Sequence, residues 1–193
     1  MTVFYVITKI LTFPGALTKA FYEQIMCKIL KCPVEDNRYI RTDEMCGHVE
    51  HEFIERPVAS FMYCFIPGLL NFLLAMFVGL FPLVNVVYLG NYTGFVASMQ
   101  ALSSAITDPN AVALVDMLLP ILFVWFTVSL LNNLFPLVED AMVMKEQYSK
   151  PNIVAKILFA PGFVVMYIGS KLEKTGLSFV ILAALSFVLA VIG

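Results

Sequence analysis

Residues 12–23 read Thr12-Phe13-Pro14-Gly15-Ala16-Leu17-Thr18-Lys19-Ala20-Phe21-Tyr22-Glu23. The flanks of this stretch are apolar, and Lys19 and Glu23 stand four residues apart, so they share one face of a helix. Ionisable groups at membrane depth are rare and usually have partners. Two interpretations follow: a buried ion pair inside a membrane helix, or a pair at the cytoplasmic interface that reaches water, as a continuation of the polar strip with Lys28 and Lys31.

The composition indicates an integral membrane protein. The 193 residues are 60% hydrophobic and only 13% charged, whereas soluble proteins carry about 25% charged residues. The mean hydropathy is +0.86. Three stretches contain no Asp, Glu, Lys or Arg: Val58–Thr107, Met117–Val138 and Thr175–Gly193. Since about 20 apolar residues span a bilayer as a helix, several transmembrane helices are expected.

The hydrophobic blocks predict an all-α, polytopic membrane protein with about four to five membrane segments. Four blocks are distinct, and a fifth is short and broken at Pro161-Gly162. The four are about Val3–Leu30, broken at Pro14-Gly15; Val58–Tyr88, containing Pro67-Gly68 and Pro82; Ala111–Val138; and Leu177–Ile192; the fifth is Ile153–Ile168. We expect one membrane domain over residues 1–193, with residues 32–57 as a polar cytoplasmic segment that forms a small hairpin or an amphipathic cover.

The basic residues predict the orientation. Lys28–Arg56 and Lys145–Lys174 each hold five of the twelve basic residues, and Gly90–Asp116 holds none. The positive-inside rule therefore places residues 90–110 outside and the two basic segments in the cytoplasm. The fifth block would then be re-entrant or interfacial, and a full fifth span is the alternative. The N-terminus lacks a basic region and a cleavage site, so we expect a retained first helix in a multi-pass protein of a prokaryotic plasma membrane.

Three short motifs follow one another along the chain. They are Phe13-Pro14-Gly15 before a helix, Pro67-Gly68-Leu69-Leu70-Asn71, and Asn133-Leu134-Phe135-Pro136-Leu137-Val138-Glu139-Asp140-Ala141. In this order they resemble the site-2 protease class of membrane-embedded zinc metalloproteases and cover about two thirds of the chain. The second motif departs by one residue from the Gly-Pro-x-x-Asn spacing of that family. The resemblance implies a site-2 protease-like helical core.

The resemblance also implies a His-Glu-x-x-His zinc motif starting four residues after Gly15, with Asp140 as the third zinc ligand. This chain has Lys19, Ala20 and Glu23 at those places. A protonated lysine does not bind zinc, and alanine cannot act as a general base. We therefore expect a degenerate site in which Lys19 supplies the positive charge of the metal and forms a buried ion cluster with Glu23 and Asp140.

The asparagines of these motifs are candidates for a structural role. Amides in apolar membrane segments usually link helices by hydrogen bonds. Asn71 and Asn133 are therefore expected to tie helices together, and Asn71, Asn133 and Pro136 would border any remaining substrate groove.

A second cluster reads Cys46-Gly47-His48-Val49-Glu50-His51-Glu52. It is rich in metal-ligating side chains but matches no established zinc signature. The candidate metal ligands are Cys46, His48, His51, Glu23 and Asp140. The alternatives are a solvated loop, or a segment that folds over the Lys19 face so that one histidine joins that cluster. The four cysteines form no Cys-x-x-Cys motif, and their expected cytoplasmic position disfavours disulfides.

The predicted function is that of a catalytically inactive protease-like protein, a pseudoenzyme that binds or scaffolds other membrane proteins. One alternative is an active membrane metalloenzyme that uses Glu23, His48, His51 and Asp140 with zinc; otherwise no cofactor is expected. Another is a small transporter or channel component with an ion path along Lys19, Glu23 and Asp140. Ser60 has no base nearby in the sequence, which disfavours serine proteolysis. The expected partners are the bilayer and other membrane proteins, and the absence of a basic tract disfavours nucleic acid.

Overall fold

The structure, a computed structural model, describes residues 3–43, 45–83, 114–150, 153–182 and 184. This part of the chain is mostly helical, with one small sheet. Its elements are α1 (Val3–Leu11), α2 (Phe13–Leu30), β1 (Val34–Asp36), β2 (Glu50–His51), α3 (Pro57–Leu83), α5 (Leu114–Leu131), α6 (Val138–Gln147) and α7 (Ile153–Lys174). The strands β1 and β2 pair in antiparallel orientation. The all-α prediction therefore needs one correction: the polar segment contains a two-stranded sheet, the hairpin form of the expected cytoplasmic cover.

The first hydrophobic block breaks at Thr12, between α1 and α2, and the predicted break at Pro14-Gly15 is wrong. Pro14 lies in the first turn of α2, where helical N–H groups have no partner within the helix, so its missing N–H costs nothing. Gly15 is needed for a different reason. A Cβ atom added there would lie 2.0 Å from the carbonyl oxygen of Ser129, so only glycine lets α2 approach the α5 backbone this closely.

Prolines inside two other helices do not end them. Helix α3 continues past Pro67, and α7 continues past Pro161, so the predicted break of the fifth block is wrong. Neighbouring helices can satisfy the backbone groups that a proline frees. Within the described residues, Pro57–Gly79 and Ile153–Lys174 are long and apolar enough to cross a membrane. The four-to-five-segment topology stays a prediction.

The later blocks differ from their predicted bounds. The block predicted over Ala111–Val138 leaves the helical conformation after Leu131, since residues 132–137 form an irregular connection that ends where α6 begins at Val138. Of the block Leu177–Ile192, residues 177–182 are helical. Residue 184 is also described, whereas residues 183 and 185–192 and the expected outer segment 90–110 lie outside the described residues.

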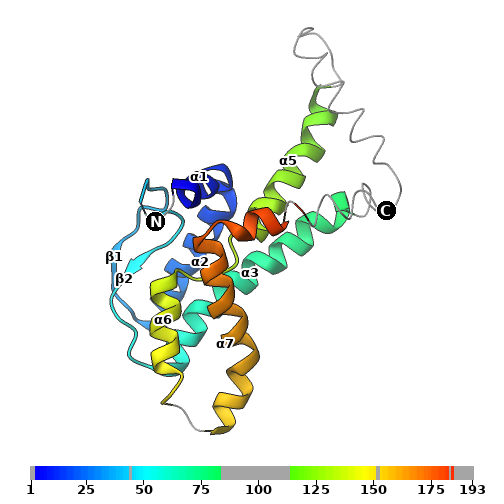
Figure 1. Cartoon of the computed structure of the whole chain (residues 1–193). Coiled ribbons are helices and arrows are strands. Elements are labelled where there is room, and N and C mark those ends of the chain that lie inside the picture. Colours follow the sequence, from blue (N-terminus) through cyan, green and yellow to red (C-terminus); the bar gives the residue numbers. More distant parts are fainter. Residues whose placement is uncertain (1–2, 44, 84–113, 151–152, 183, 185–193) are drawn as a thin grey trace.

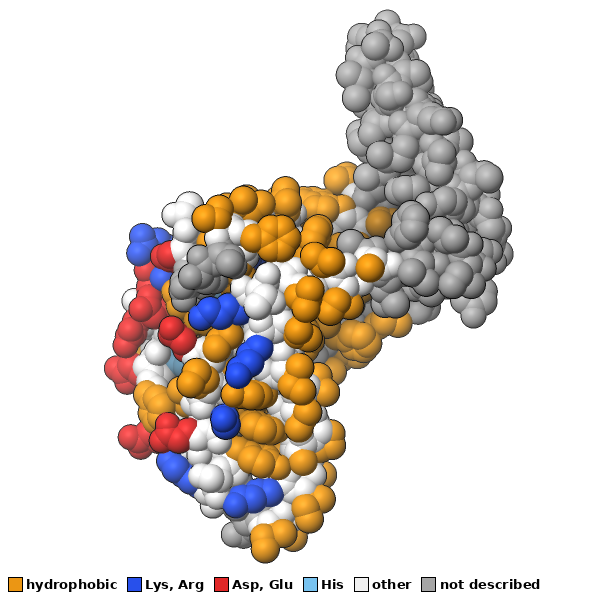
Figure 2. Space-filling view, viewed as in Figure 1, with side chains coloured by type: hydrophobic (Ala, Val, Ile, Leu, Met, Phe, Trp, Pro, Cys, Tyr) orange, Lys and Arg blue, Asp and Glu red, His pale blue; other side chains and the backbone are white. Residues whose placement is uncertain are grey.

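The helices pack around α3. Figure 1 shows α2 and α5 along α3 on one side, with α6 and α7 on the other and the β1–β2 sheet beside α2 and α6. The buried apolar cluster joins side chains of α2, α3, α6 and α7; among them are Met26, Cys27, Tyr63, Cys64, Met144 and Met166. Figure 2 shows acidic side chains gathered on one side of the molecule and hydrophobic side chains over the opposite side. The face in this view is therefore amphipathic.

Candidate functional site

Lys19 and Glu23 lie inside the protein. Their side chains are 1% and 2% exposed, and the Lys19 Nζ atom is 3.5 Å from the Glu23 Oε1 atom. The ammonium group also donates a hydrogen bond to the backbone carbonyl oxygen of Phe135. The interpretation of this pair as a water-exposed interface pair is therefore wrong. The i,i+4 spacing produces a buried ion pair. We call Lys19, Glu23 and His48 the Lys19 cluster.

The polar segment brings His48 into this cluster. The His48 side chain is 1% exposed, and its Nδ1 atom lies 3.1 Å from Glu23 Oε1 and 3.4 Å from Lys19 Nζ. The Val49 backbone N–H donates to the other Glu23 carboxylate oxygen at 3.0 Å. Gly47, with a φ of +78°, lies against Ala16 of α2 and makes this close docking feasible. One histidine thus joins the cluster, as the third interpretation of this segment proposed.

His48 is electrically neutral in this position. Burial, followed by the positive charge of Lys19, lowers the pKa of His48 more than the Glu23 carboxylate raises it. Because a carboxylate can only accept, we assign the His48 proton to Nδ1, which donates to Glu23. The Nε2 atom is then a lone-pair acceptor, and it has no hydrogen-bond partner among the described residues.

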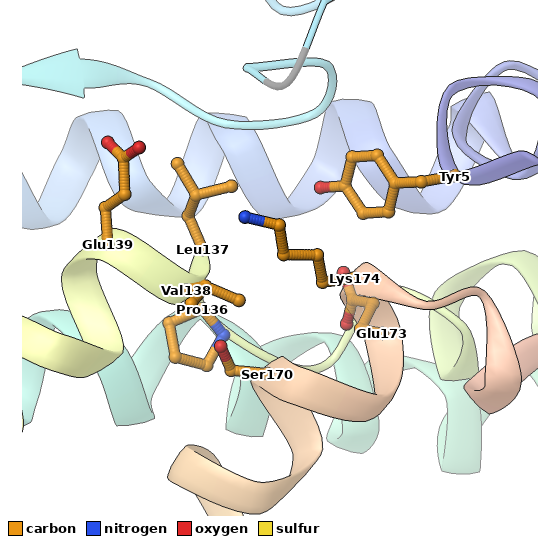
Figure 3. A pocket seen from close by; sticks show the side chains of 8 residues that line it. All are labelled: Tyr5, Pro136, Leu137, Val138, Glu139, Ser170, Glu173 and Lys174. Atoms are coloured by element: carbon orange, nitrogen blue, oxygen red, sulfur yellow. The ribbon is translucent and has the colours of Figure 1, made fainter. Parts of the chain in front are cut away.

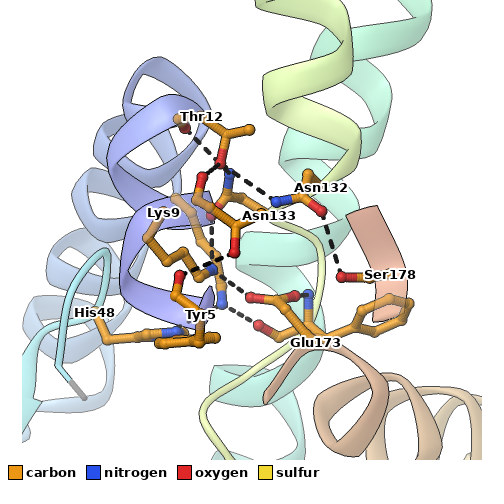
Figure 4. A network of polar contacts seen from close by, with 12 residues as sticks. Tyr5, Lys9, Thr12, His48, Asn132, Asn133, Glu173 and Ser178 are labelled. Atoms are coloured by element: carbon orange, nitrogen blue, oxygen red, sulfur yellow. Dashed lines mark hydrogen bonds and ion pairs between the residues drawn. The ribbon is translucent and has the colours of Figure 1, made fainter. Parts of the chain in front are cut away.

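A second buried lysine lies nearby. The Lys9 side chain is 1% exposed and pairs with Glu173, which is 4% exposed. The Lys9 ammonium also donates to Asn133 Oδ1 at 2.6 Å. Figure 4 shows this Lys9 cluster, with Lys9 and Asn133 facing Glu173 from different elements. Neither Lys9 nor Glu173 is among the site residues that the sequence predicts. Lys9 in an apolar block was the available signal, but Glu173 stands between two basic neighbours and looked like part of a solvated helix end.

The peptide groups of Phe135 connect the two clusters. Its N–H donates to Glu173 Oε2 at 3.0 Å, and its carbonyl oxygen accepts from Lys19. Two lysines and two carboxylates are therefore buried together around one irregular segment, and their formal charges cancel. Breaking a buried pair of this kind by removing one partner typically costs about 3–5 kcal/mol.

Asn71 and Asn133 hold this segment in place. The Asn71 side-chain amide donates to the carbonyl oxygens of Gly15 at 3.0 Å and Asn133 at 2.9 Å, and its oxygen accepts from Thr18 at 3.0 Å. The Asn133 amide donates to the Thr12 hydroxyl at 3.0 Å. Both asparagines are fully buried. They contact α2, α3 and the α5–α6 connection, which is the expected helix-tying arrangement.

Pro136 borders a space too small for a peptide. Figure 3 shows a cavity lined by Pro136, Ser170 and Glu173, and its volume of about 10 Å³ admits one water molecule. The Ser170 hydroxyl is buried without a hydrogen-bond partner among the described residues. A substrate groove at Pro136 is therefore not formed in this structure.

Asp140 lies apart from the Lys19 cluster. Its Oδ1 atom is 3.4 Å from the Nε2 atom of His51, and no ion pair of the described residues joins it to Lys19. Burial lowers the pKa of His51, but the neighbouring Asp140 carboxylate outweighs burial, so that the pKa is raised overall. The Nδ1 atom of His51 is 2.6 Å from the Glu52 carbonyl oxygen. The Nε2 atom is therefore within ion-pair distance of Asp140 but makes no hydrogen bond among the described residues.

His51 and Asp140 line a cavity of about 200 Å³. Ser60 and Cys64 share its wall. The cavity therefore brings Ser60 near a histidine and a carboxylate that are distant in the sequence. No hydrogen bond among the described residues joins the Ser60 hydroxyl to His51, so the two residues do not form a nucleophile–base pair in this structure.

The candidate metal ligands do not converge. Glu23 pairs with His48 and Asp140 pairs with His51, while Cys46 is buried with its sulfur in neither pair. The described residues contain no group of three or more His, Cys, Asp or Glu side chains placed to hold a metal ion. The donor set around Lys19 does not suit zinc, because an ammonium group stands at the first ligand position and both Glu23 oxygens already accept hydrogen bonds.

The geometry of the site is accordingly that of a neutralised polar core. It consists of the Lys19 and Lys9 clusters, joined through Phe135 and held by two asparagines. No protein-family model, curated protein or solved structure matches this chain, so the likeness to the site-2 protease class rests on the sequence motifs alone.

Proposed function

We propose that this chain is a catalytically inactive, site-2 protease-like membrane protein that binds or scaffolds other membrane proteins. The observation that supports this proposal is the position of Lys19. Its ammonium group pairs with Glu23 and hydrogen-bonds the Phe135 carbonyl oxygen, deep in the polar core. In the site-2 protease class that the sequence motifs resemble, the position of Lys19 holds a zinc ligand.

The chemistry of the neighbouring positions agrees with a loss of catalysis. Ala20 is 0% exposed and stands where the general base would be. A methyl group in this position cannot move a proton, and Glu23 is held by His48 and the Val49 N–H. Apart from the Nε2 atom of His48, the polar groups of the two clusters hydrogen-bond to one another. Their role in this proposal is to fix how α1, α2, α3 and α7 pack.

The outer surface supports the binding part of the proposal. Several large apolar side chains of α3 are exposed, and Phe77 is 85% exposed. In a bilayer such a surface faces lipid or a partner helix. A scaffold needs a rigid core and an accessible helical face, and this chain has both.

The experiment uses photo-crosslinking in native membranes. A photoreactive amino acid at Phe77 should crosslink to a discrete membrane protein, whereas the same label at Ala75, which is 2% exposed on the same helix, should not. Adducts with lipid alone from Phe77 and the other exposed α3 positions would contradict the scaffold proposal.

Metal analysis separates this proposal from an active metalloenzyme. The purified wild-type protein, incubated with one equivalent of zinc and desalted, should retain no more zinc than its Lys19→Met variant. Stoichiometric zinc that is lost on His48→Ala or His51→Ala would favour the enzyme and overturn the proposal.

The buried charges favour a small transporter component as a second candidate function. Two buried lysine–carboxylate pairs meet at Phe135, and the buried Nε2 atom of His48 has no partner among the described residues. Such groups can form a proton or ion relay. Ion flux into proteoliposomes that disappears in the Lys19→Met variant would favour transport. Equal background flux for both proteins would remove this candidate.

A further inference from the structure

Two lysines converge on one aromatic ring at the surface. Lys145 stands in the last turn of α6, and Lys171 follows Tyr167 by one turn of α7. The Lys145 Nζ atom lies 5.3 Å from the centre of the Tyr167 ring, and the Lys171 Nζ atom lies 4.7 Å from it. We call Lys145, Tyr167 and Lys171 the lysine–tyrosine site.

This site keeps its positive charge. Neither lysine forms an ion pair with a carboxylate among the described residues, and both side chains are exposed. The nearest acidic residue on α7, Glu173, is buried and pairs with Lys9 on the inner side of the helix. The Tyr167 ring attracts both ammonium groups but does not neutralise them. Two like charges are therefore held together at the surface without an ion pair to a carboxylate of the described residues.

An apolar surface begins directly beside the site. Val164 and Ile168 are 49% and 52% exposed on α7, and the i,i+3 spacing places Val164 beside Tyr167 and Ile168 beside Lys171 on the helix. Figure 2 shows a row of Lys and Arg side chains along the border between the acidic side and the hydrophobic side of the molecule. At a membrane, this border is the level of the lipid headgroups, where lysines extend to the polar region.

We propose that the lysine–tyrosine site binds the phosphate headgroup of an anionic phospholipid whose acyl chains lie against Val164 and Ile168. Two ammonium groups complement the phosphate charge, and the tyrosine hydroxyl can donate a third contact. The apolar neighbours favour a lipid over a free phosphate. This inference does not depend on the scaffold proposal, because it concerns the outer face of α6 and α7.

The test is native mass spectrometry of the full chain in detergent, titrated with phosphatidylglycerol or phosphatidylcholine. We expect a saturable phosphatidylglycerol adduct that weakens as salt rises. The Lys145→Gln/Lys171→Gln variant should bind roughly 25-fold more weakly, about fivefold for each lysine. The matched control is Lys28→Gln/Lys31→Gln, which removes two exposed lysines at the end of α2 and should leave the adduct unchanged.

The Tyr167→Phe variant is a second test that leaves both lysines intact. It should weaken binding of phosphatidylglycerol less than the double lysine variant does. Added glycerol phosphate should not displace the lipid. Equal binding of both lipids, equal losses in the two double variants, or full displacement by glycerol phosphate would each overturn the proposal.

Discussion

Lys19→Met is the sharpest perturbation of the polar core. Methionine approximates the length of lysine but carries no charge, so the variant leaves the Glu23 carboxylate buried beside a neutral His48 and removes the donor to the Phe135 carbonyl oxygen. Because Lys19 is 1% exposed, solvent cannot replace the lost partner. We expect a loss of about 3–5 kcal/mol in the free energy of unfolding.

The assay is thermal unfolding in detergent, followed by circular dichroism. For a chain of this size, that loss corresponds to a decrease in Tm of roughly 6–20 °C. The matched control is Lys28→Met, which removes an exposed lysine from the same helix and should change the stability by less than about 0.5 kcal/mol.

The double variant Lys19→Met/Glu23→Gln tests the reasoning itself. If the single variant is unstable because it leaves a buried carboxylate unpaired, then removing that charge as well should restore part of the stability. The double variant should therefore be more stable than Lys19→Met alone. A loss for Lys19→Met of under about 1 kcal/mol, with additive effects in the double variant, would refute a buried coupled pair, since that is how exposed pairs behave.

Three further predictions concern the same core, each measured as Tm in detergent. Asn71→Ala removes the side-chain donor to the Asn133 carbonyl oxygen and one of two side-chain donors to the Gly15 carbonyl oxygen, and should cost about 1–3 kcal/mol, whereas little change would contradict its helix-tying role. Gly15→Ala forces a Cβ atom against the α5 backbone and should cost about 1–3 kcal/mol or more; an unchanged Tm would mean that the helices are not so close. The pKa of His51 is raised in the folded state. Its contribution to the free energy of unfolding is therefore complete below the unfolded pKa of about 6.5 and is lost as pH rises through the folded pKa. The pKa of His48 is lowered in the folded state. Its contribution to the free energy of unfolding is therefore present above the unfolded pKa and is lost as pH falls. His51→Gln and His48→Gln should therefore change the pH dependence of Tm in opposite directions, and a shared direction would refute these assignments.

Local spacing in the sequence predicts part of the site. Lys19 and Glu23 are four residues apart on a continuous helix, so their pairing follows from the helix alone. The Lys9–Glu173 pair joins residues 164 positions apart, and no local pattern relates them. Sequence analysis placed Asp140 beside Lys19 only through the resemblance. The partner that it has, His51, depends on where the β1–β2 segment docks.

For the helices too, the sequence predicts some features, whereas others depend on packing. Apolar composition predicts α3 and α7, because a long apolar run forms a helix wherever water is excluded. The predicted breaks at prolines are less reliable, since the cost of a proline depends on its neighbours. Pro14 falls in a first turn, where the cost vanishes, and Pro161 falls inside α7, which continues through it.

Under the proposed function, the two lysine clusters explain why a catalytically inactive, site-2 protease-like core would retain buried polar groups. A carboxylate in a buried site without a cation costs several kcal/mol, so the buried Glu23 needs a positive partner. Lys19 is that partner, and His48 and the Val49 N–H satisfy the remaining acceptors of Glu23. Under the proposed function, each of these residues is retained for stability. Lys19→His and Glu23→His together would not create a zinc site, because Asp140, the third ligand that the resemblance implies, lies apart and pairs with His51.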